Sequence, residues 1–397
     1  MITEIYAYEE APPSYSASIF LVGPTPRKND VKSWRTDALQ VISEVYKNQE
    51  LEVVVFIPEP RNNIFRSNYL EQVEWEKQHL EMADAIFAWI PRDMTTSLKA
   101  LTTNIEFGKY VESGKLFYGR PDNADHIKYL DWMYTDITGR QPVKSLAALT
   151  DEVATYLRSC YLNIGAKSVR EAGERYIPLS IWCTPPFQNW YQSQKQAGNQ
   201  LLYAKLLWTF AVHSINFVFS YALHVKVWIA AENRIKSNEF IVSRSDISVV
   251  VPYWKHPTDP WQSEIVLIKE FRSPARTADG FVHELPGGSN PKTGDDQLQL
   301  ASDELYEETS LKIDAARFRY LDSKQIAATW STHFANVYAI ALEKHEIEKA
   351  KQLASAGQTF GVKEDTEKTY VEVCQLKNIG KYVDWSMEGM IYRAIFG

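Results

Sequence analysis

The sequence predicts a chain of two parts. Residues 1–160 are expected to form an α/β region with a doubly wound parallel sheet, and residues 222–397 an α+β region. Two observations favour this division. Short β-branched or aromatic runs alternate with helix-length stretches in the first region, whereas short strands dominate the second, which contains one acidic helical stretch. Residues 161–221 are rich in aromatic residues, Gln and Asn, and are expected to form a helical connector.

The first region repeats a strand and helix alternation. Parallel strands need a crossover connection, usually a helix, so the alternation predicts helices on both faces of the sheet. Such a flavodoxin-like or Rossmann-like arrangement binds ligands at the carboxyl ends of its strands. The predicted strands are 18–22, 53–57, 85–90 and 115–118, and the predicted helices are 33–47, 69–82, 104–113 and 146–160.

An uncharged segment between Lys205 and Lys226 is long enough in principle to cross a bilayer. Polar residues interrupt it, and residues 223–228 alternate like a strand. We therefore expect a buried helix leading into a strand rather than a membrane span. Further strands are predicted at 225–230, 247–253, 264–271 and 337–342.

Composition narrows the functional class. The 397 residues carry a net charge of -7, and their 43 Lys and Arg include no run of five, so duplex nucleic acid is not an expected partner. Cys160, Cys183 and Cys374 lack metal-site or redox-pair spacing, which fits a reducing compartment. Residues 1–4 lack the basic and apolar start of a secretory signal. We expect a cytoplasmic protein that acts on small molecules, without a membrane partner.

The loops after the four predicted strands share polar and turn-forming residues. The first contains Gly23, Pro24 and Arg27, the second Arg61, and the others Arg92 and Arg120. Gly, Pro and Asp also fill ordinary turns, which is the alternative explanation. Because the four loops meet at one sheet edge, we predict an electropositive rim that binds an anionic small molecule.

The same region resembles the nucleoside 2-deoxyribosyltransferase superfamily, in particular its deoxyribosyltransferase-like branch. The resemblance spans about residues 17–135. It is carried in order by 19–24 (IFLVGP), 72–76 (QVEWE), 83–87 (ADAIF), 102–108 (TTNIEFG) and 113–115 (SGK).

The resemblance implies roles for individual residues. Glu106 matches the nucleophile that attacks the anomeric carbon, and Glu76, or else Glu74, the acid that assists the base or sugar. Asp84 and Asn104 lie in matching segments and are expected to bind substrate. An exposed helical glutamate is the alternative for Glu106. Family members complete their sites across subunits, so a homo-oligomer is expected.

Two positions depart from the family pattern. Phe20 stands where a tyrosine is frequent, and Ala100 where the transferases often have an aspartate. Both losses favour hydrolysis, or an altered substrate, over base exchange. Ser33 and Arg35, with Arg27, are candidates for binding a 5′-phosphate, although Arg35 equally suits a solvated helix.

In the second region, residues 303–308 (DELYEE) place Glu304, Glu307 and Glu308 on one helix face. Like charges this close repel unless a cation lies among them, and oxygen ligands suit Mg²⁺ or Mn²⁺. We therefore predict a metal site formed by these three glutamates. A solvated acidic helix face is the alternative.

The strand-like residues 281–285, Gly287-Gly288 and this acidic helix resemble the Nudix box, and residues 265–274 resemble the strand before the box in ADP-ribose pyrophosphatases. The resemblance implies a Nudix α/β/α fold, with Glu307 and Glu308 catalytic and Arg272 and Glu284 at the substrate. The departures from the family pattern are Asp303 for an arginine, Asp295 for a glutamate, Ser310 for a glycine, and Gly288 one residue early; Glu364, Asp365 and Glu367 are candidates for a further acid.

Together these features predict a nucleotide-metabolising enzyme. Its first domain would cleave or transfer an N-glycosidic bond, and its second would act with Mg²⁺ or Mn²⁺ on a nucleoside diphosphate derivative. In the alternative, the second domain is a non-catalytic nucleotide sensor that regulates the first.

Overall fold

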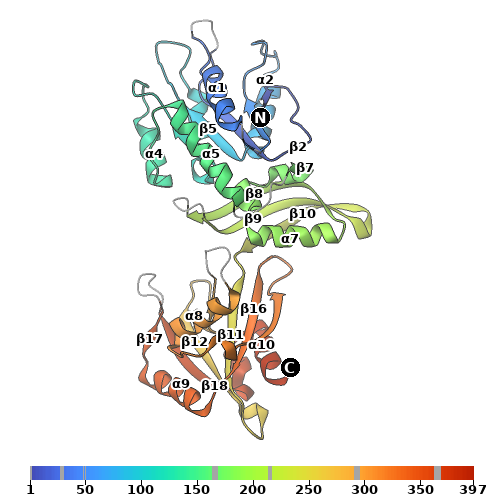
Figure 1. Cartoon of the computed structure of the whole chain (residues 1–397), viewed down its shortest axis with the longest axis vertical. Helices are drawn as coiled ribbons and strands as arrows, with labels where there is room; N and C mark the ends of the chain where they lie inside the picture. The colour runs from blue at the N-terminus through green and yellow to red at the C-terminus, as the bar shows by residue number, and fades with distance from the viewer. Residues whose placement is uncertain are drawn as a thin grey trace. The chain divides into compact units, whose positions relative to one another are not determined.

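A computed structural model describes residues 2–26, 31–47, 49, 51–162, 169–212, 217–289, 296–361 and 368–397 (Figure 1). The chain divides into two compact units, Met1–Arg244 and Ser245–Gly397. The first unit therefore extends past the predicted connector and includes residues 222–244. Several predicted site residues lie outside the described residues: Arg27, Asp295, Glu364, Asp365 and Glu367.

Unit 1 is built on a parallel sheet, as predicted. The strand order is β1-β4-β3-β5-β6. The chain reverses its direction of travel between β3 and β5, which makes their carboxyl ends the switch point where ligands bind in such sheets. The strands are β1 (Ile2–Tyr6), β3 (Ala17–Val22), β4 (Val53–Ile57), β5 (Ala85–Trp89) and β6 (Leu116–Gly119); edge strand β1 was not predicted.

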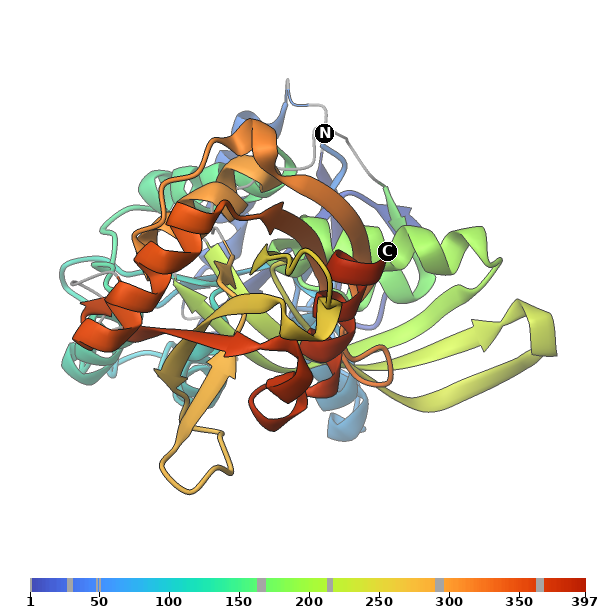
Figure 2. The ribbon, with the colours of Figure 1, turned by 90° about the horizontal axis from the view of Figure 1, so that it is seen from below.

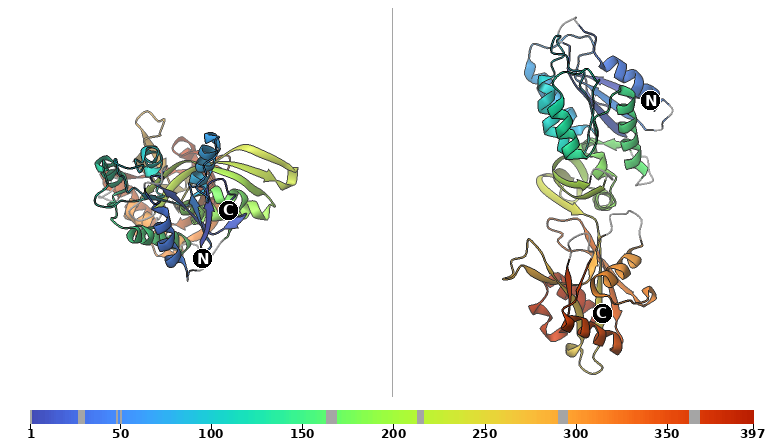
Figure 3. Two further views of the ribbon diagram at one scale, coloured as in Figure 1. Left: turned by 90° about the horizontal axis from the view of Figure 1, so that it is seen from above. Right: turned by 90° about the vertical axis from the view of Figure 1, so that its left-hand side faces the viewer.

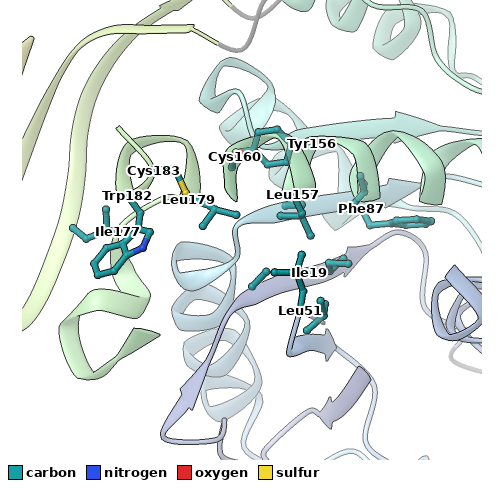
Figure 4. Packing of buried hydrophobic residues seen from close by; sticks show 14 of the residues in the cluster. Ile19, Leu51, Phe87, Tyr156, Leu157, Cys160, Ile177, Leu179, Trp182 and Cys183 are labelled. Atoms are coloured by element: carbon teal, nitrogen blue, oxygen red, sulfur yellow. The ribbon is translucent and has the colours of Figure 1, made fainter. Parts of the chain in front are cut away.

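Helices cover both faces of this sheet (Figure 3, right). Alternate residues of β3 point to opposite sides: Ile19 and Leu21 join one hydrophobic cluster, and Phe20 and Val22 the other. The first cluster packs under α1 (Arg35–Tyr46) and α5 (Leu146–Leu162), and Figure 4 shows part of it. The second lies under α2 (Tyr69–Met82), α3 (Leu101–Tyr110) and α4 (Lys128–Thr138), of which α4 was not predicted.

The predicted connector is helical only in its first part. After α6 (Leu179–Trp182) and α7 (Pro185–Gln196) come β8 (Gln200–Val212), β9 (Phe217–Ile229) and β10 (Arg234–Arg244), which form an antiparallel sheet whose long hairpin is visible in Figure 2. In addition, β2 (Ser14–Tyr15) pairs with β7 (Arg170–Glu171).

The prediction of a helix in the uncharged segment was therefore wrong. The pairing of β8 with β9 shifts register between Leu201 and Tyr203 and again between Leu206 and Trp208. These bulges break the two-residue alternation that identifies a strand, and an uncharged run without alternation looks like a buried helix. Among the described residues, the structure contains no helix with the length and apolar character needed to span a bilayer.

Unit 2 is a mixed sheet in the order β15-β16-β11-β12-β18-β17, with β11 and β16 parallel. Helices α8 and α9 cover one face, and α10 covers the other. The strands are β11 (Ile247–Trp254), β12 (Glu264–Phe271), β13 (Phe281–Glu284), β14 (Gly287–Gly288), β15 (Arg319–Gln325), β16 (Phe334–Ala341), β17 (Thr359–Phe360) and β18 (Thr369–Gln375). The helices are α8 (Gln297–Thr309), α9 (Lys344–Ala356) and α10 (Trp385–Phe396).

Candidate functional site

The loop after β3 is drawn tightly against the end of β5. A Cβ atom on Gly23 would overlap the carbonyl oxygen of Trp89 and the ring of Trp34, so only glycine fits there. The indole Nε1 of Trp34 donates a hydrogen bond of 3.0 Å to the carbonyl of Pro24. Gly23 and Pro24 therefore shape the switch point, the position at which the sequence predicted them.

A buried arginine of α1 holds the same loop after β3. Arg35, at the first turn of α1, is 2% exposed and donates to the carbonyl oxygens of Gly23 (2.8 Å) and Leu21 (3.3 Å). Its Nη1 also lies 2.5 Å from Oε1 of Glu59, which accepts a second hydrogen bond of 2.9 Å from Ser33. The phosphate candidates Arg35 and Ser33 are therefore engaged in positioning the loop after β3.

Two carboxylates come together between α2 and α3. Glu106, on α3, is half-buried, and its pKa is raised to about 7, chiefly by burial and further by the negative charge of Glu76, while Arg35 opposes the rise. Glu76, on α2, accepts a hydrogen bond of 2.6 Å from Nε2 of Gln72. Glu74, the second choice for the assisting acid, is exposed.

Gln72 fixes Glu76 relative to the sheet edge. The same Nε2 that binds Glu76 also donates 3.2 Å to the carbonyl of Pro58, just after β4. Sequence reasoning did not identify Gln72, although its position four residues before Glu76 places both on one helix face. Likewise, Glu59 binds the buried Arg35, whereas the sequence prediction for loop 58–61 named only Arg61.

Within the described residues, the arginines of the predicted rim are bound to protein groups. Arg61 pairs with Glu9 at 2.8 Å, and Arg120 with Asp131 at 2.6 Å. Arg92 donates to the side chain of the exposed Asn104, two residues before Glu106, and 2.7 Å to the carbonyl of His126. These arginines therefore brace the loops, and the contact of Arg92 with Asn104 lies two residues from Glu106 in the sequence.

Asp84 lies at the other end of the sheet. It precedes β5, at the amino end of that strand, and is fully buried. It accepts 2.8 Å from the backbone N–H of Ser18 and forms an ion pair with the fully buried Arg170. Ligands of a parallel sheet bind at the carboxyl ends, so this position assigns Asp84 to the fold rather than to the Glu106 site.

In unit 2, two of the three predicted metal ligands, Glu304 and Glu308, face a glycine turn. Glu308 is buried and accepts 3.0 Å from the backbone N–H of Gly287, and the Glu304 carboxylate occupies the space that a Cβ on Gly288 would need. Glu307 is exposed. Carboxylates suit Mg²⁺ in type, but within the described ranges no three His, Cys, Asp or Glu side chains are arranged to hold a metal ion.

The other predicted residues of unit 2 pair with each other. Arg272 donates to the carboxylate of Glu284 at 3.0 and 2.8 Å and lies 2.8 Å from Glu270. Ser310 ends α8 in the left-handed conformation, with φ of 56°. That conformation explains why a glycine suits this position.

Unit 1 is thus an α/β domain with paired carboxylates near the switch point of a parallel sheet. Residues 16–123 match the protein-family model described as nucleoside 2-deoxyribosyltransferase like, which identifies an N-terminal domain of that type. The match contains Glu76 and Glu106 and ends before unit 2, so the Nudix resemblance stays a prediction. No curated protein matches the chain.

Proposed function

We propose that unit 1 cleaves the N-glycosidic bond of a nucleoside or nucleotide, with Glu106 as the nucleophile. The observation that carries this proposal is the position of Glu106: it lies within the family-matched segment and is half-buried, and its pKa is raised to about 7 by burial and further by the charge of Glu76. Nucleophiles and acids with shifted pKa values are typical of catalytic sites.

The chemistry follows from the two carboxyl groups. A carboxylate oxygen of Glu106 attacks the anomeric carbon while the bond to the base nitrogen breaks and its electron pair stays on the base. Glu76, in its protonated form, donates a proton to the departing base. Water then attacks the anomeric carbon of the glycosyl ester and gives a proton to the Glu76 carboxylate, which releases the sugar and restores both Glu106 and Glu76.

Mutual repulsion supports this division of labour. Two neighbouring carboxylates resist ionising together, so near neutral pH one proton is held between them on average. One group is then available as a nucleophile and the other as an acid. Because the pKa of Glu106 is about 7 and the shared proton is lost above that pH, we expect the rate to fall as the pH increases beyond 7.

Hydrolysis is the preferred outcome for two reasons. Phe20 is fully buried in the cluster under α2 and α3 and offers no hydroxyl to the site. Ala100 begins α3 in a left-handed conformation, with φ of 54°, and provides no side-chain hydrogen bond. The polar groups that the transferases often use at these positions are therefore missing, and water is the simplest acceptor.

The test uses the full chain with a panel of nucleosides and nucleoside monophosphates, and free base is measured chromatographically. Glu106→Gln is expected to lower base release by about 10⁴-fold or more, as for removal of a nucleophile. The matched control is Glu74→Gln, an exposed acid on α2, which should retain the wild-type rate. No free base from any substrate, or an undiminished rate in Glu106→Gln, would overturn the proposal.

For unit 2 we propose binding of a nucleoside diphosphate derivative as a sensor. Asp303 stands where the Nudix pattern has an arginine, and Glu308 already accepts a hydrogen bond from the backbone N–H of Gly287. The alternative, a pyrophosphohydrolase, requires Glu304, Glu307 and Glu308 to gather around Mg²⁺ or Mn²⁺. Incubation with ADP-ribose-like diphosphates and Mg²⁺ separates them: phosphate products lost in Glu307→Gln indicate the enzyme, and binding without products the sensor.

A further inference from the structure

A hollow lies in unit 1, on the opposite face of the sheet from α3, the helix that carries Glu106. Phe117 of β6 belongs to the cluster under α1 and α5, whereas its neighbours Leu116 and Tyr118 belong to the cluster under α2 and α3. The hollow has a volume of about 420 Å³, which is within the usual size of small-molecule sites. It is lined by Phe117, Arg140, Asp151, Glu152, Thr155 and Tyr156.

Flat groups form one side of the hollow. The guanidinium carbon of Arg140 lies 5.0 Å from the ring centre of Phe117, and the rings of Phe117 and Tyr156 are 5.0 Å apart at 48°. Phe117 and Tyr156 are buried, with exposed fractions of 2% and 4%, and the partly exposed guanidinium of Arg140 lies over the Phe117 ring. The planar surface open to a ligand is therefore the guanidinium, on which a flat heterocycle stacks. This arrangement favours a planar ligand over a flexible aliphatic one.

Glu152 supplies a hydrogen-bond acceptor beside these surfaces. It is half-buried, and among the described residues its Oε2 is enclosed without a hydrogen-bond partner. Burial raises the pKa of this carboxyl, against the effect of Arg140. A buried carboxylate oxygen without a hydrogen-bond donor is unfavourable. After a small rotation of the Glu152 carboxyl group, the N–H groups of a ligand would supply the missing donors.

The charges around the hollow limit the ligand further. Asp151 and Glu152 would repel a phosphate or carboxylate, and Arg140 would repel a cation. A neutral heterocycle meets neither penalty. Two adjacent N–H donors match the two oxygens of one carboxylate, whereas a donor next to a ring-nitrogen acceptor places that acceptor against an oxygen.

We propose that this hollow binds a neutral, nucleobase-like heterocycle with two adjacent N–H donors, as in guanine, stacked on the guanidinium of Arg140 and hydrogen-bonded to Glu152. The site is separate from the Glu106 carboxylate and does not depend on the proposed glycosidic cleavage.

Calorimetric titration of the full chain tests the proposal with 9-methylguanine, 9-methylhypoxanthine and 9-methyladenine, which have no sugar to cleave. We expect 9-methylguanine to bind most tightly. Glu152→Gln, which is isosteric, should weaken that binding by about 10- to 100-fold, the usual range for a good bidentate base contact. Asp151→Asn, which removes the same charge from the same helix, should change it by less than about fivefold.

Two further variants complete the design. Arg140→Lys keeps the charge but removes the planar group, so it should also weaken binding, and it decides the matter if Glu152→Gln does not fold. Glu106→Gln should bind 9-methylguanine as the wild type does. The proposal is overturned by equal binding of 9-methyladenine, by wild-type affinity in Glu152→Gln, or by loss of binding in Glu106→Gln.

Discussion

The carboxylates of Asp84 and Glu106 in unit 1 are held differently from those of Glu304 and Glu308 in unit 2. In unit 1 they face other charges in or near the interior: Asp84 pairs with Arg170, and Glu106 feels both Glu76 and Arg35. In unit 2 Glu304 and Glu308 instead pack against the main chain of a glycine turn. The first arrangement depends on the charges of neighbouring side chains, and the second on close packing against the backbone. Charge-changing substitutions should therefore disturb unit 1 most, and added atoms unit 2.

The largest effect is expected at the buried ion pair of unit 1. Asp84→Asn keeps the shape but leaves the Arg170 charge in the interior without its partner. Removing one partner of a buried pair destabilises by about 3–5 kcal/mol. Chemical denaturation of the full chain, with hydrogen exchange read for unit 1 peptides, measures the change.

Glu71→Gln serves as the matched control because Glu71 pairs with Arg66 on the surface, where both are largely exposed. Surface pairs contribute about 0–1 kcal/mol. Equal losses in the two variants would contradict the claim that buried charge sets the stability of unit 1.

A smaller and pH-dependent effect is expected at Glu106. Its pKa is about 7 in the folded protein against an ordinary value of 4.5. Above pH 7 the folded chain therefore carries an unfavourable Glu106 carboxylate. As the pH falls, protonation removes this charge, and below pH 4.5 Glu106 is protonated in both the folded and the unfolded chain. Glu106→Gln should stabilise unit 1 by up to about 3 kcal/mol above pH 7, with the gain declining towards zero by pH 4.5.

Denaturation curves of wild type and Glu106→Gln across this pH range provide the measurement. A pH-independent difference would mean that Glu106 titrates normally, and would remove the main electrostatic support for its role. Glu74→Gln, at an exposed position, controls for the loss of a negative charge as such.

In unit 2 neighbouring glycines allow a steric test. A Cβ on Gly287 would meet the backbone oxygen of Ser248, which cannot easily move, whereas a Cβ on Gly288 would meet the end of the Glu304 side chain. Gly287→Ala should therefore destabilise unit 2 by about 1–3 kcal/mol, and Gly288→Ala by less. The same denaturation measurement, read on unit 2 peptides, compares them; a larger loss in Gly288→Ala would show that Glu304 is held rigidly.

The sequence was most informative where burial is complete. Strands β3, β4 and β5 are buried on both faces, so they appear as uninterrupted apolar runs between turn residues and could be located. The bulged strands β8 and β9 could not, because their alternation is broken. Asp84 was predicted to bind substrate, but it lies at the amino end of β5. The sequence pattern does not distinguish a polar residue before a strand from one after it, and the partner Arg170 lies 86 residues away.

Site residues followed the same rule. Glu106 and Glu76 were predicted as site residues by resemblance to a family, and in the structure the charge of Glu76 contributes to the raised pKa of Glu106. Gln72 and Glu59 were not predicted, because no local sequence pattern encodes their contacts. Gln72 binds the carbonyl of Pro58 at the end of a strand, and Glu59 binds the buried Arg35. In unit 2, the helix spacing placed three acids on one face but could not predict that one of them binds Gly287.

The smallest predicted effect concerns the end of α8. Helices α4 and α9 end at Gly139 and Gly357 in the left-handed conformation, with φ of 69° and 61°, while α8 ends at Ser310 with φ of 56°. Because a side chain is strained there and glycine is not, Ser310→Gly should stabilise unit 2 by about 1 kcal/mol. The reverse change, Gly357→Ser, should destabilise it by a similar amount. If Ser310→Gly instead weakens unit 2, the Ser310 side chain must make a contact worth more than the backbone strain.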